Sequence, residues 1–237
     1  MIDRITEVLT LNKLLRWPRN VIKKFLFYYF LKKKVVLLYY HKPDQQKIFN
    51  LINQIKKESE ILLGHNEAHQ IFKTIEAVAK IQGDIAEVGV YRGGSAKLIC
   101  EAKKNKTLHL FDTFKGLPDA GNSDGLLRKG DYTASFERVK NYLKNYENVY
   151  FYKGLFPLTA EPIKNKKFSF VHLDVDLYES TLNCLKFFYP RISRGGVIIS
   201  HDYGCDSGVK KAFDEFFKDK LESIIELSGT QCLVTKL

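Results

Sequence analysis

The sequence predicts a doubly wound α/β fold, with a mostly parallel sheet of seven strands that ends in an antiparallel hairpin. Short apolar runs alternate with helical segments of about 10–15 residues, which is the pattern of βαβ units. The last two apolar runs are separated only by Ser228, Gly229 and Thr230, too few residues for a crossover helix. A length of 237 residues, with 45% hydrophobic and 27% charged residues, suits one globular domain with an extension.

The predicted strands are short runs rich in β-branched and aromatic residues. They are expected at residues 84–90, 107–111, 148–152, 168–173, 196–200, 224–227 and 231–234. The predicted helices repeat apolar residues every three or four positions, which places these side chains on one face. They are expected at residues 44–63, 66–81, 94–104, 134–145, 178–189 and 207–219. Five βα units followed by a hairpin give a seven-stranded sheet with one reversed strand.

Residues 1–43 differ from the rest of the chain in charge and composition. They hold ten Lys and Arg against two acidic residues, whereas the whole chain has a formal net charge of +11. Between Val21 and Tyr40, lysine clusters alternate with aromatic and aliphatic blocks, as in segments that lie on an anionic membrane surface. We therefore predict a basic extension at 1–43 and a domain at 44–237. Packing of the extension on the core or on a second subunit, and a polyanion partner, are the alternatives.

Acidic residues follow the predicted parallel strands at the ends where an open sheet binds its ligands. The strand ends carry Glu87 before a glycine-rich loop, then Asp112, then Asp174 with Asp176, and finally His201 with Asp202. The third strand is the exception, because Lys153 and Gly154 follow it. Such a concentration of acids in a basic chain predicts a functional edge of the sheet.

The first of these loops distinguishes two classes of ligand. Dinucleotide-binding folds use G-x-G-x-x-G so that the backbone can approach a pyrophosphate. Here the glycines are Gly89, Gly93 and Gly94, and Glu87 precedes them. A carboxylate in this place would repel a pyrophosphate and suits a cationic ligand. S-adenosylmethionine, with an ammonium, a sulfonium and no phosphate, fits, and Asp112 stands where an acid binds ribose hydroxyls.

Five segments carry a resemblance to a known family. They are Glu87–Ser95, Phe111–Pro118, Lys153–Thr159, Leu173–Thr181 and Gly195–Tyr203, and the string L-D-V-D-L-Y-E-S-T in the fourth is the most specific. In this order they resemble the macrocin O-methyltransferase family, which methylates sugars of macrolides and aminocoumarins. The resemblance implies a class I methyltransferase, Rossmann-like fold, S-adenosylmethionine as donor, and metal-assisted methylation of a sugar hydroxyl.

The same resemblance assigns site residues. The donor is expected to contact Glu87, Gly89, Tyr91, Gly93, Ser95, Asp112, Thr113, Phe114 and Gly154. Asp174 is implied as a metal ligand and candidate base, and Asp202 as a second ligand of a divalent cation, Mg²⁺. The family has two consecutive acids where this chain has His201 and Asp202. An imidazole can replace a carboxylate on a metal but suits magnesium less well, and His201 could instead accept the proton. Both roles of His201, catalytic base and metal ligand, stay open.

Two further features near the strand ends have alternative interpretations. Asp176 could bind the metal or cap the helix that follows it. The segment Thr113–Thr133 is long and holds four glycines, which predicts a lid over donor and acceptor or, alternatively, a surface excursion.

The sequence also bears on partners and location. We expect a small-molecule or glycan acceptor and no nucleic-acid partner. The sequence leaves open whether the chain forms a homo-oligomer. The first apolar stretch is interrupted by lysines, unlike a signal peptide, and the cysteine spacing fits neither a zinc site nor a disulfide framework. Both observations favour a cytoplasmic protein. If the extension binds lipid, the protein would lie at the inner membrane face. The alternative functions are methylation of another small-molecule or nucleic-acid hydroxyl, and an inactive membrane-associated interaction module. A nicotinamide dehydrogenase lacks support, because G-x-G-x-x-G is absent.

Overall fold

The computed structural model describes residues 42–205 and 208–237. The predicted extension at 1–43 lies almost wholly outside these residues, so its boundary and its role remain predictions. The stretch from His41 to Leu237 forms one compact unit.

The described residues form the predicted seven-stranded sheet. Its strands are β1 Asp84–Val88, β2 Leu108–Asp112, β3 Val149–Lys153, β4 Phe168–Leu173, β5 Ile192–Ser200, β6 Ile225–Glu226 and β7 Cys232–Thr235. They lie in the order β3-β2-β1-β4-β5-β7-β6. The first five are parallel, and β7 pairs antiparallel with both β5 and β6. The doubly wound fold with one reversed strand is therefore confirmed.

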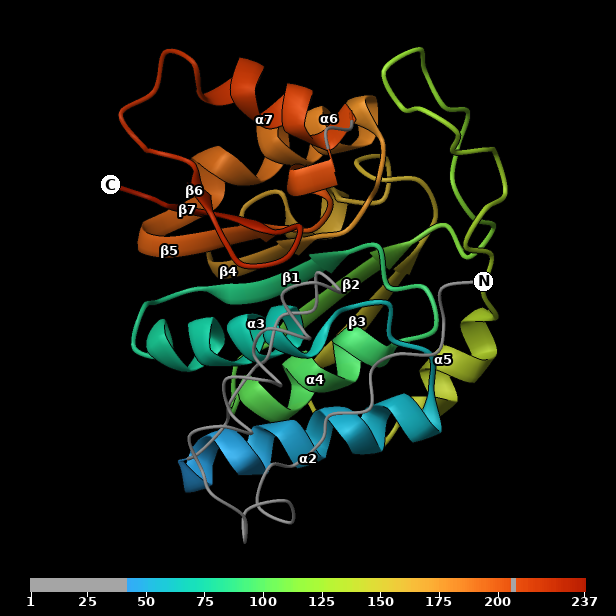
Figure 1. Cartoon of the computed structure of the whole chain (residues 1–237), viewed down its shortest axis with the longest axis vertical. Helices are drawn as coiled ribbons and strands as arrows, with labels where there is room; N and C mark the ends of the chain where they lie inside the picture. Colours follow the sequence, from blue (N-terminus) through green and yellow to red (C-terminus); the bar gives the residue numbers. More distant parts are fainter. Residues whose placement is uncertain (1–41, 206–207) are drawn as a thin grey trace, which may run out of the picture. The chain divides into compact units, whose positions relative to one another are not determined.

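Helices cover both faces of this sheet (Figure 1). One face carries α2 Pro43–Glu58, α3 His65–Ala77, α4 Gly94–Ala102 and α5 Phe136–Tyr142, and the other carries α6 Tyr178–Phe188 and α7 Gly208–Phe217. Short 3₁₀ turns lie at Glu161–Ile163, Tyr189–Arg191 and Tyr203–Cys205. All six predicted helices are present, and each is shorter than predicted, α2 and α5 by the most. In α2 the reason is local, because Ser59 has extended φ and ψ of −148° and 161° and ends the helix.

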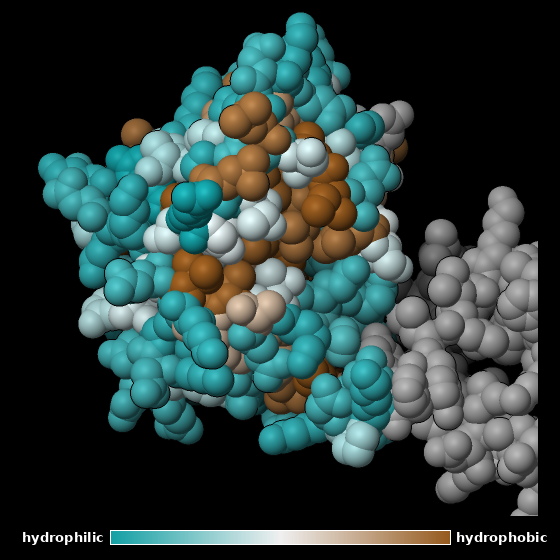
Figure 2. Space-filling model, turned by 90° about the vertical axis from the view of Figure 1, so that its left-hand side faces the viewer, coloured by the Kyte–Doolittle hydropathy of each residue, from teal (hydrophilic) through white to brown (hydrophobic). Residues whose placement is uncertain are grey.

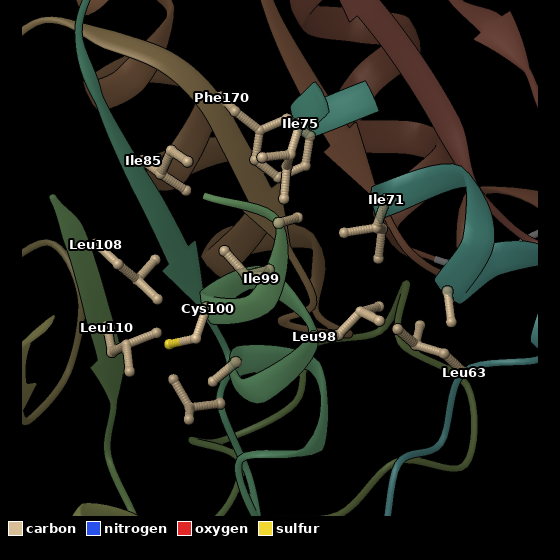
Figure 3. Close-up of a cluster of buried hydrophobic side chains, with 14 of the residues drawn as sticks. Leu63, Ile71, Ile75, Ile85, Leu98, Ile99, Cys100, Leu108, Leu110 and Phe170 are labelled. Atoms are coloured by element: carbon tan, nitrogen blue, oxygen red, sulfur yellow. The ribbon is translucent and has the colours of Figure 1, made fainter. Parts of the chain in front are cut away.

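Alternate residues of each central strand enter different halves of the core. In β1, Ile85 packs on the α3 and α4 side, while Ala86 and Val88 pack on the α6 and α7 side. Figure 3 shows the first half, in which Ile71 of α3 and Ile99 of α4 gather over the strands. A sheet buried on both faces exposes mainly the ends of its strands, and polar residues at those ends are free to bind ligands.

Figure 2 shows one face of the molecule, and the rim of the described part is largely hydrophilic there. On this face, which lies at the left in Figure 1, where the chain ends, an apolar patch lies within the rim. Within the described residues, none of the helices combines the length and apolar character needed to cross a membrane. The four cysteines carry free thiols, and three of them, Cys100, Cys184 and Cys232, are buried.

Candidate functional site

The carboxyl ends of β1, β2, β4 and β5 meet at one edge of the sheet. Backbone hydrogen bonds continue beyond the strands, from the Gly89 amide to Phe111 and from the Asp174 amide to Val88. Gly89 has a φ of +91°, and a Cβ at this position would lie 1.7 Å from the Asp174 carbonyl oxygen. Only glycine allows β1 and β4 to leave the sheet this close together, so this residue helps to bring the predicted site residues into one place.

A cavity of about 320 Å³ opens at this edge. Five of the nine residues predicted to contact the donor line it: Gly89, Tyr91, Asp112, Thr113 and Gly154. Its walls also include apolar side chains, Leu62, Val88, Phe111, Leu117, Leu155, Phe156 and Val175. The lining also contains a polar group of four residues, Asp174, Asp176, His201 and Asp202. The cavity thus combines an apolar wall with a cluster of acidic groups, which would suit a nucleoside that carries positive charge.

Asp112 holds the loop after β1 while it faces this cavity. Its Oδ2 accepts hydrogen bonds of 2.8 Å from the backbone amides of Val90 and Tyr91, and Oδ1 accepts one of 2.6 Å from Phe114. Burial raises the pKa of this carboxyl although three amides donate to it. Asp112 therefore fixes the shape of the glycine loop and also lines the cavity.

The other four predicted donor contacts lie outside the cavity lining. Glu87 is fully buried, and its Oε1 lies 3.0 Å from Nδ1 of His172 on the neighbouring strand β4. Gly93, Ser95 and Phe114 are also buried, Gly93 as the N-cap of α4 with a φ of 82°. Burial raises the pKa of Glu87, with the hydrogen bond from His172 acting against it. The structure thus places Glu87 behind the site, and its predicted contact with the donor remains untested.

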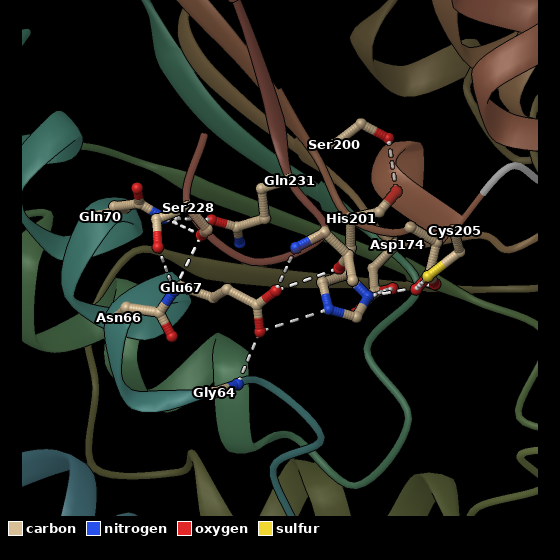
Figure 4. Close-up of polar contacts among 12 residues, drawn as sticks. Gly64, Asn66, Glu67, Gln70, Asp174, Ser200, His201, Cys205, Ser228 and Gln231 are labelled. Atoms are coloured by element: carbon tan, nitrogen blue, oxygen red, sulfur yellow. Dashed lines mark hydrogen bonds and ion pairs between the residues drawn. The ribbon is translucent and has the colours of Figure 1, made fainter. Parts of the chain in front are cut away.

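Beside the cavity, His201 lies among three carboxylates (Figure 4). Its Nδ1 is 3.3 Å from Asp174 Oδ1 and 3.1 Å from Asp202 Oδ2, and its Nε2 is 3.6 Å from Glu67 Oε2. Burial favours the neutral imidazole, but the carboxylates outweigh it and raise the pKa of His201. Likewise, burial alone would raise the pKa of Asp174, and His201 lowers it. Asp174 and His201 are therefore a coupled pair of opposite charge.

Glu67 is a site residue that the sequence did not reveal. It lies on α3, is only 6% exposed, and accepts hydrogen bonds from the Gly64 amide and from the amide and hydroxyl of Thr230. Burial opposes its ionisation, yet His201 and these backbone amides lower its pKa to about 2. Nothing in a lone glutamate on an amphipathic helix signals this role. The signal is the fold itself, since α3 meets the β6–β7 hairpin only in three dimensions.

Asp176 faces the cavity and leaves the helix cap to another residue. The backbone amide of Tyr178, at the start of α6, donates instead to Asp124 Oδ1 at 2.7 Å. Burial, together with the charges of Asp174 and Asp202, raises the pKa of Asp176 to about 8. Of the two interpretations of Asp176, helix cap or ligand in the site, the structure contradicts the cap.

A second hollow of about 450 Å³ adjoins the first. It is lined by Asn122, Ser123, Asp124, Gly125, Leu127, Tyr132, Asp176, Asp202 and Cys205. Asp176, Asp202 and Tyr132 line both spaces. The segment Thr113–Thr133 contributes to both as well, which agrees with its predicted place over donor and acceptor.

The spacing of three side chains next to the cavity suits a metal ion. Asp174, His201 and Asp202 each offer a ligand atom, and these atoms lie within 4.8 Å of one another. His201 Nδ1 is buried and makes no hydrogen bond, although two carboxylate oxygens lie near it. One imidazole nitrogen and two carboxylate oxygens this close together form a donor set that a divalent cation could occupy.

Comparisons with known proteins agree with this geometry. The family model described as Macrocin-O-methyltransferase (TylF) matches residues 2–227. Demethyldecarbamoylnovobiocin O-methyltransferase of Streptomyces niveus is 32% identical over 175 residues, 65% of this chain and 66% of that protein. The 8-demethyl-8-(2,3-dimethoxy-alpha-L-rhamnosyl)-tetracenomycin-C 4'-O-methyltransferase of Streptomyces olivaceus is 31% identical over 144 residues, 54% of this chain and 55% of that protein. The alignments thus span slightly less than two thirds and about half of the length of these two relatives.

Solved structures show the same fold. The O-methyltransferase NovP superposes with a TM-score of 0.64 at 27% identity, over 74% of this chain and 81% of that one. The calicheamicin methyltransferase CalS11 superposes with a TM-score of 0.63 at 16% identity, over 83% of this chain and 94% of that one, which supports the fold alone. From the family model and the class I methyltransferase fold, we conclude that this chain belongs to the macrocin O-methyltransferase family.

Proposed function

We propose that this protein transfers a methyl group from S-adenosylmethionine to a hydroxyl group of a sugar. The observation that carries the proposal is the shared wall of the two hollows. Methyl transfer requires the acceptor oxygen, the methyl carbon and the sulfur in one line, and positioning supplies most of the acceleration. The donor would occupy the cavity beside Asp112 and the acceptor the adjoining hollow, so that they meet at Asp176, Asp202 and Tyr132.

The donor side has the chemistry that S-adenosylmethionine needs. Apolar residues such as Phe111 and Leu117 can enclose the adenine ring, and Asp112 can accept hydrogen bonds from the ribose hydroxyls. The carboxylates in the same lining, Asp174, Asp176 and Asp202, favour a ligand that carries an ammonium and a sulfonium. Expulsion of water from this cavity would strengthen their attraction.

The acceptor side is polar. The described residues that line it offer amide, hydroxyl and carboxylate groups, which are the kinds of group that bind sugar hydroxyls. These groups belong to Asn122, Ser123 and Asp124. The names of the relatives point the same way: one acts on a demethyldecarbamoylnovobiocin, and another at the 4' position of a rhamnosyl-tetracenomycin.

The proposed reaction forms one bond and breaks one bond. The acceptor oxygen forms a bond to the methyl carbon while the carbon–sulfur bond breaks, and the sulfur keeps the electron pair, so that S-adenosylhomocysteine leaves. The hydroxyl proton must go to a base. Asp176 lines both hollows, next to the point where donor and acceptor would meet, and is the candidate general base. His201 is a weaker candidate, because three carboxylates favour its protonated form.

A divalent cation belongs to this proposal. Asp174, His201 and Asp202 would hold it, and when bound it would supply positive charge that favours the deprotonated acceptor hydroxyl. Asp174 and Asp202 then act as ligands and not as bases. Tyr132, which lines both hollows, would help to exclude water from the acceptor.

Calorimetry and product analysis test the proposal. S-adenosylmethionine and S-adenosylhomocysteine should bind to the full chain, and labelled methyl groups should appear in sugar acceptors, with free nucleotide sugars and lipid-linked sugars tested in parallel. The absence of donor binding at millimolar concentration would overturn the proposal in favour of an inactive interaction module. Methylation of a sugar-free phenol or of RNA, but of no sugar, would overturn the acceptor class.

For the predicted extension we propose association with an anionic membrane surface. The support is its alternation of lysine clusters and aromatic blocks, within residues that lie outside the described part. Vesicles with phosphatidylserine should bind the full chain at low salt, and a chain that lacks residues 1–41 should bind donor but not vesicles. Indifference of the full chain to such vesicles would reject membrane association.

A further inference from the structure

The residue that differs from the family pattern lies at the centre of the cluster. Where the family resemblance implies two consecutive carboxylates, this chain has His201 followed by Asp202. The imidazole presents Nδ1, and not Nε2, to Asp174 and Asp202. The candidate donor set therefore contains one nitrogen and two carboxylate oxygens.

The far side of the imidazole is held by Glu67. The Glu67 carboxylate lies 3.6 Å from His201 Nε2, and Figure 4 shows it between α3 and the imidazole. Its Oε1 accepts from the Thr230 amide at 2.8 Å and its Oε2 from the Gly64 amide at 2.7 Å. A Cβ on Gly229 would lie 2.4 Å from Glu67 Oε1, so the hairpin closes tightly over this carboxylate. Glu67 is thus fixed by two separate elements and cannot easily turn away.

This arrangement decides which nitrogen is available. With a cation bound, a carboxylate fixed near Nε2 would keep a proton on that nitrogen, so that the Nδ1 lone pair would face the ion between Asp174 and Asp202. In metal sites, a carboxylate behind a histidine orients the ring and increases the basicity of the nitrogen that binds the ion. Nδ1 already faces the two carboxylates that would share the ion with it.

We propose that His201 Nδ1 is a metal ligand positioned by Glu67, and that the site selects a divalent first-row transition metal over magnesium. Magnesium prefers oxygen ligands and retains its water, whereas imidazole nitrogen suits manganese poorly to moderately and cobalt, nickel and zinc well. One imidazole beside two carboxylates should therefore strengthen the preference for these metals over magnesium, compared with an all-carboxylate site. This inference rests on the proposed function for the location of the site, and it adds the identity of the ion and the role of Glu67.

Equilibrium binding to the full chain gives the first test. Co²⁺ should bind at least about tenfold more tightly than Mg²⁺ to the unsubstituted protein. His201→Asp should abolish most of this difference, and Glu67→Gln should weaken Co²⁺ binding by about 10- to 100-fold. Glu76→Gln, on the exposed side of the same helix, is the matched control and should leave Co²⁺ affinity unchanged. Equal affinity of the unsubstituted protein for Mg²⁺ and Co²⁺ would overturn the inference.

Spectroscopy gives a second test, and its main readout needs only the unsubstituted protein. Pulsed electron paramagnetic resonance of bound Mn²⁺ should show a coupling to imidazole ¹⁴N in the unsubstituted protein. The coupling should be lost in His201→Asp, and its absence from the unsubstituted protein would overturn the inference. Calorimetry with S-adenosylhomocysteine, without added metal, separates the two hypotheses: intact donor binding with no metal preference rejects only this inference, while lost donor binding rejects the proposed function.

Discussion

Asp124 Oδ1 accepts a hydrogen bond of 2.7 Å from the backbone amide of Tyr178, so a residue of the long loop caps α6. The N-cap residue of α6 itself, Leu177, has no side-chain cap to offer. Asp124 is 5% exposed, and its Oδ2 accepts a second bond of 2.7 Å from the Gly121 amide. The carboxylate thereby ties the loop to the helix that follows Asp176 and leaves Asp176 free to face the site.

We predict that Asp124→Ala loosens the loop and lowers stability. The substitution removes the acceptor of two backbone amides, and loss of a helix cap costs about 1 kcal/mol. Urea denaturation should show a decrease of about 1–2 kcal/mol in the free energy of unfolding. Hydrogen exchange should become faster at residues 117–131.

Asp119→Ala is the matched control in the same loop. Asp119 is highly exposed, and its ion-pair partner among the described residues is Lys129, itself exposed, a type of pair that contributes little. Its removal should change neither exchange nor stability measurably. If both variants behave alike, Asp124 is not the tie between loop and helix.

Gly208→Ala should disturb the same contact from the other side. A Cβ on Gly208 would lie 2.1 Å from Asp124 Oδ1 and 2.8 Å from the Tyr178 amide nitrogen. The methyl group must displace the carboxylate, so we expect a loss of stability similar to that of Asp124→Ala. The double variant should be little worse than either single one, because both remove one interaction. Additive losses, measured by urea denaturation, would show that the two residues act independently.

The fold was predictable because its signals are local and repeated. Alternation of strands and helices, and a gap of three residues before the last strand, required nothing beyond neighbouring positions. The edge at which Asp112, Asp174 and Asp202 meet followed from the rule that parallel strands end together. The helix ends were less predictable, since Ser59 and Gly64 stop and start helices through backbone angles that apolar periodicity does not reveal.

The parts of the site that escaped prediction depend on contacts between distant segments. Glu67 resembles any surface glutamate of an amphipathic helix, and only the hairpin at Thr230 shows that it is buried. Asp124 resembles any acid of a glycine-rich loop. The pairing of Glu87 with His172 inside the core was equally hidden in the sequence, because the two residues lie on different strands.

We predict that Asp112→Asn weakens binding of S-adenosylhomocysteine. The amide retains one oxygen, so it can serve only part of the three backbone donors and the ribose hydroxyls. Loss of one or two hydrogen bonds to a charged acceptor should lower affinity by about 10- to 100-fold. Calorimetry at constant pH measures it, with Asp119→Asn as a control. Unchanged affinity would place the ribose elsewhere.

Asp176→Asn should separate chemistry from donor binding. The amide keeps the size of the side chain but cannot accept the acceptor proton, so the rate of methyl transfer should decrease by about 10²- to 10⁴-fold. The dissociation constant of S-adenosylhomocysteine should change far less than this rate. Single-turnover assays with saturating donor measure the rate. A variant that retains more than a tenth of the rate would exclude Asp176 as the base.

The last prediction concerns stability and pH, and rests on His65 of α3. The ring is 7% exposed, stacks on Phe49 with centroids 5.0 Å apart, and its Nε2 lies 2.9 Å from Asn53 Oδ1. Burial, reinforced by the charge of Lys56, lowers the pKa of His65 to about 4.

Because His65 titrates at a lower pH in the folded than in the unfolded protein, the unfolded state binds more protons between pH 6.5 and 4. The stability due to neutral His65 is complete above pH 6.5 and is lost as the pH falls toward 4. We expect a loss of about 2 kcal/mol between pH 7 and pH 5. His65→Gln, which can still donate to Asn53, should be less stable at pH 7 but lose about 2 kcal/mol less on acidification. Urea denaturation of both proteins at the two pH values measures this difference, and equal losses would show that His65 does not titrate in this range.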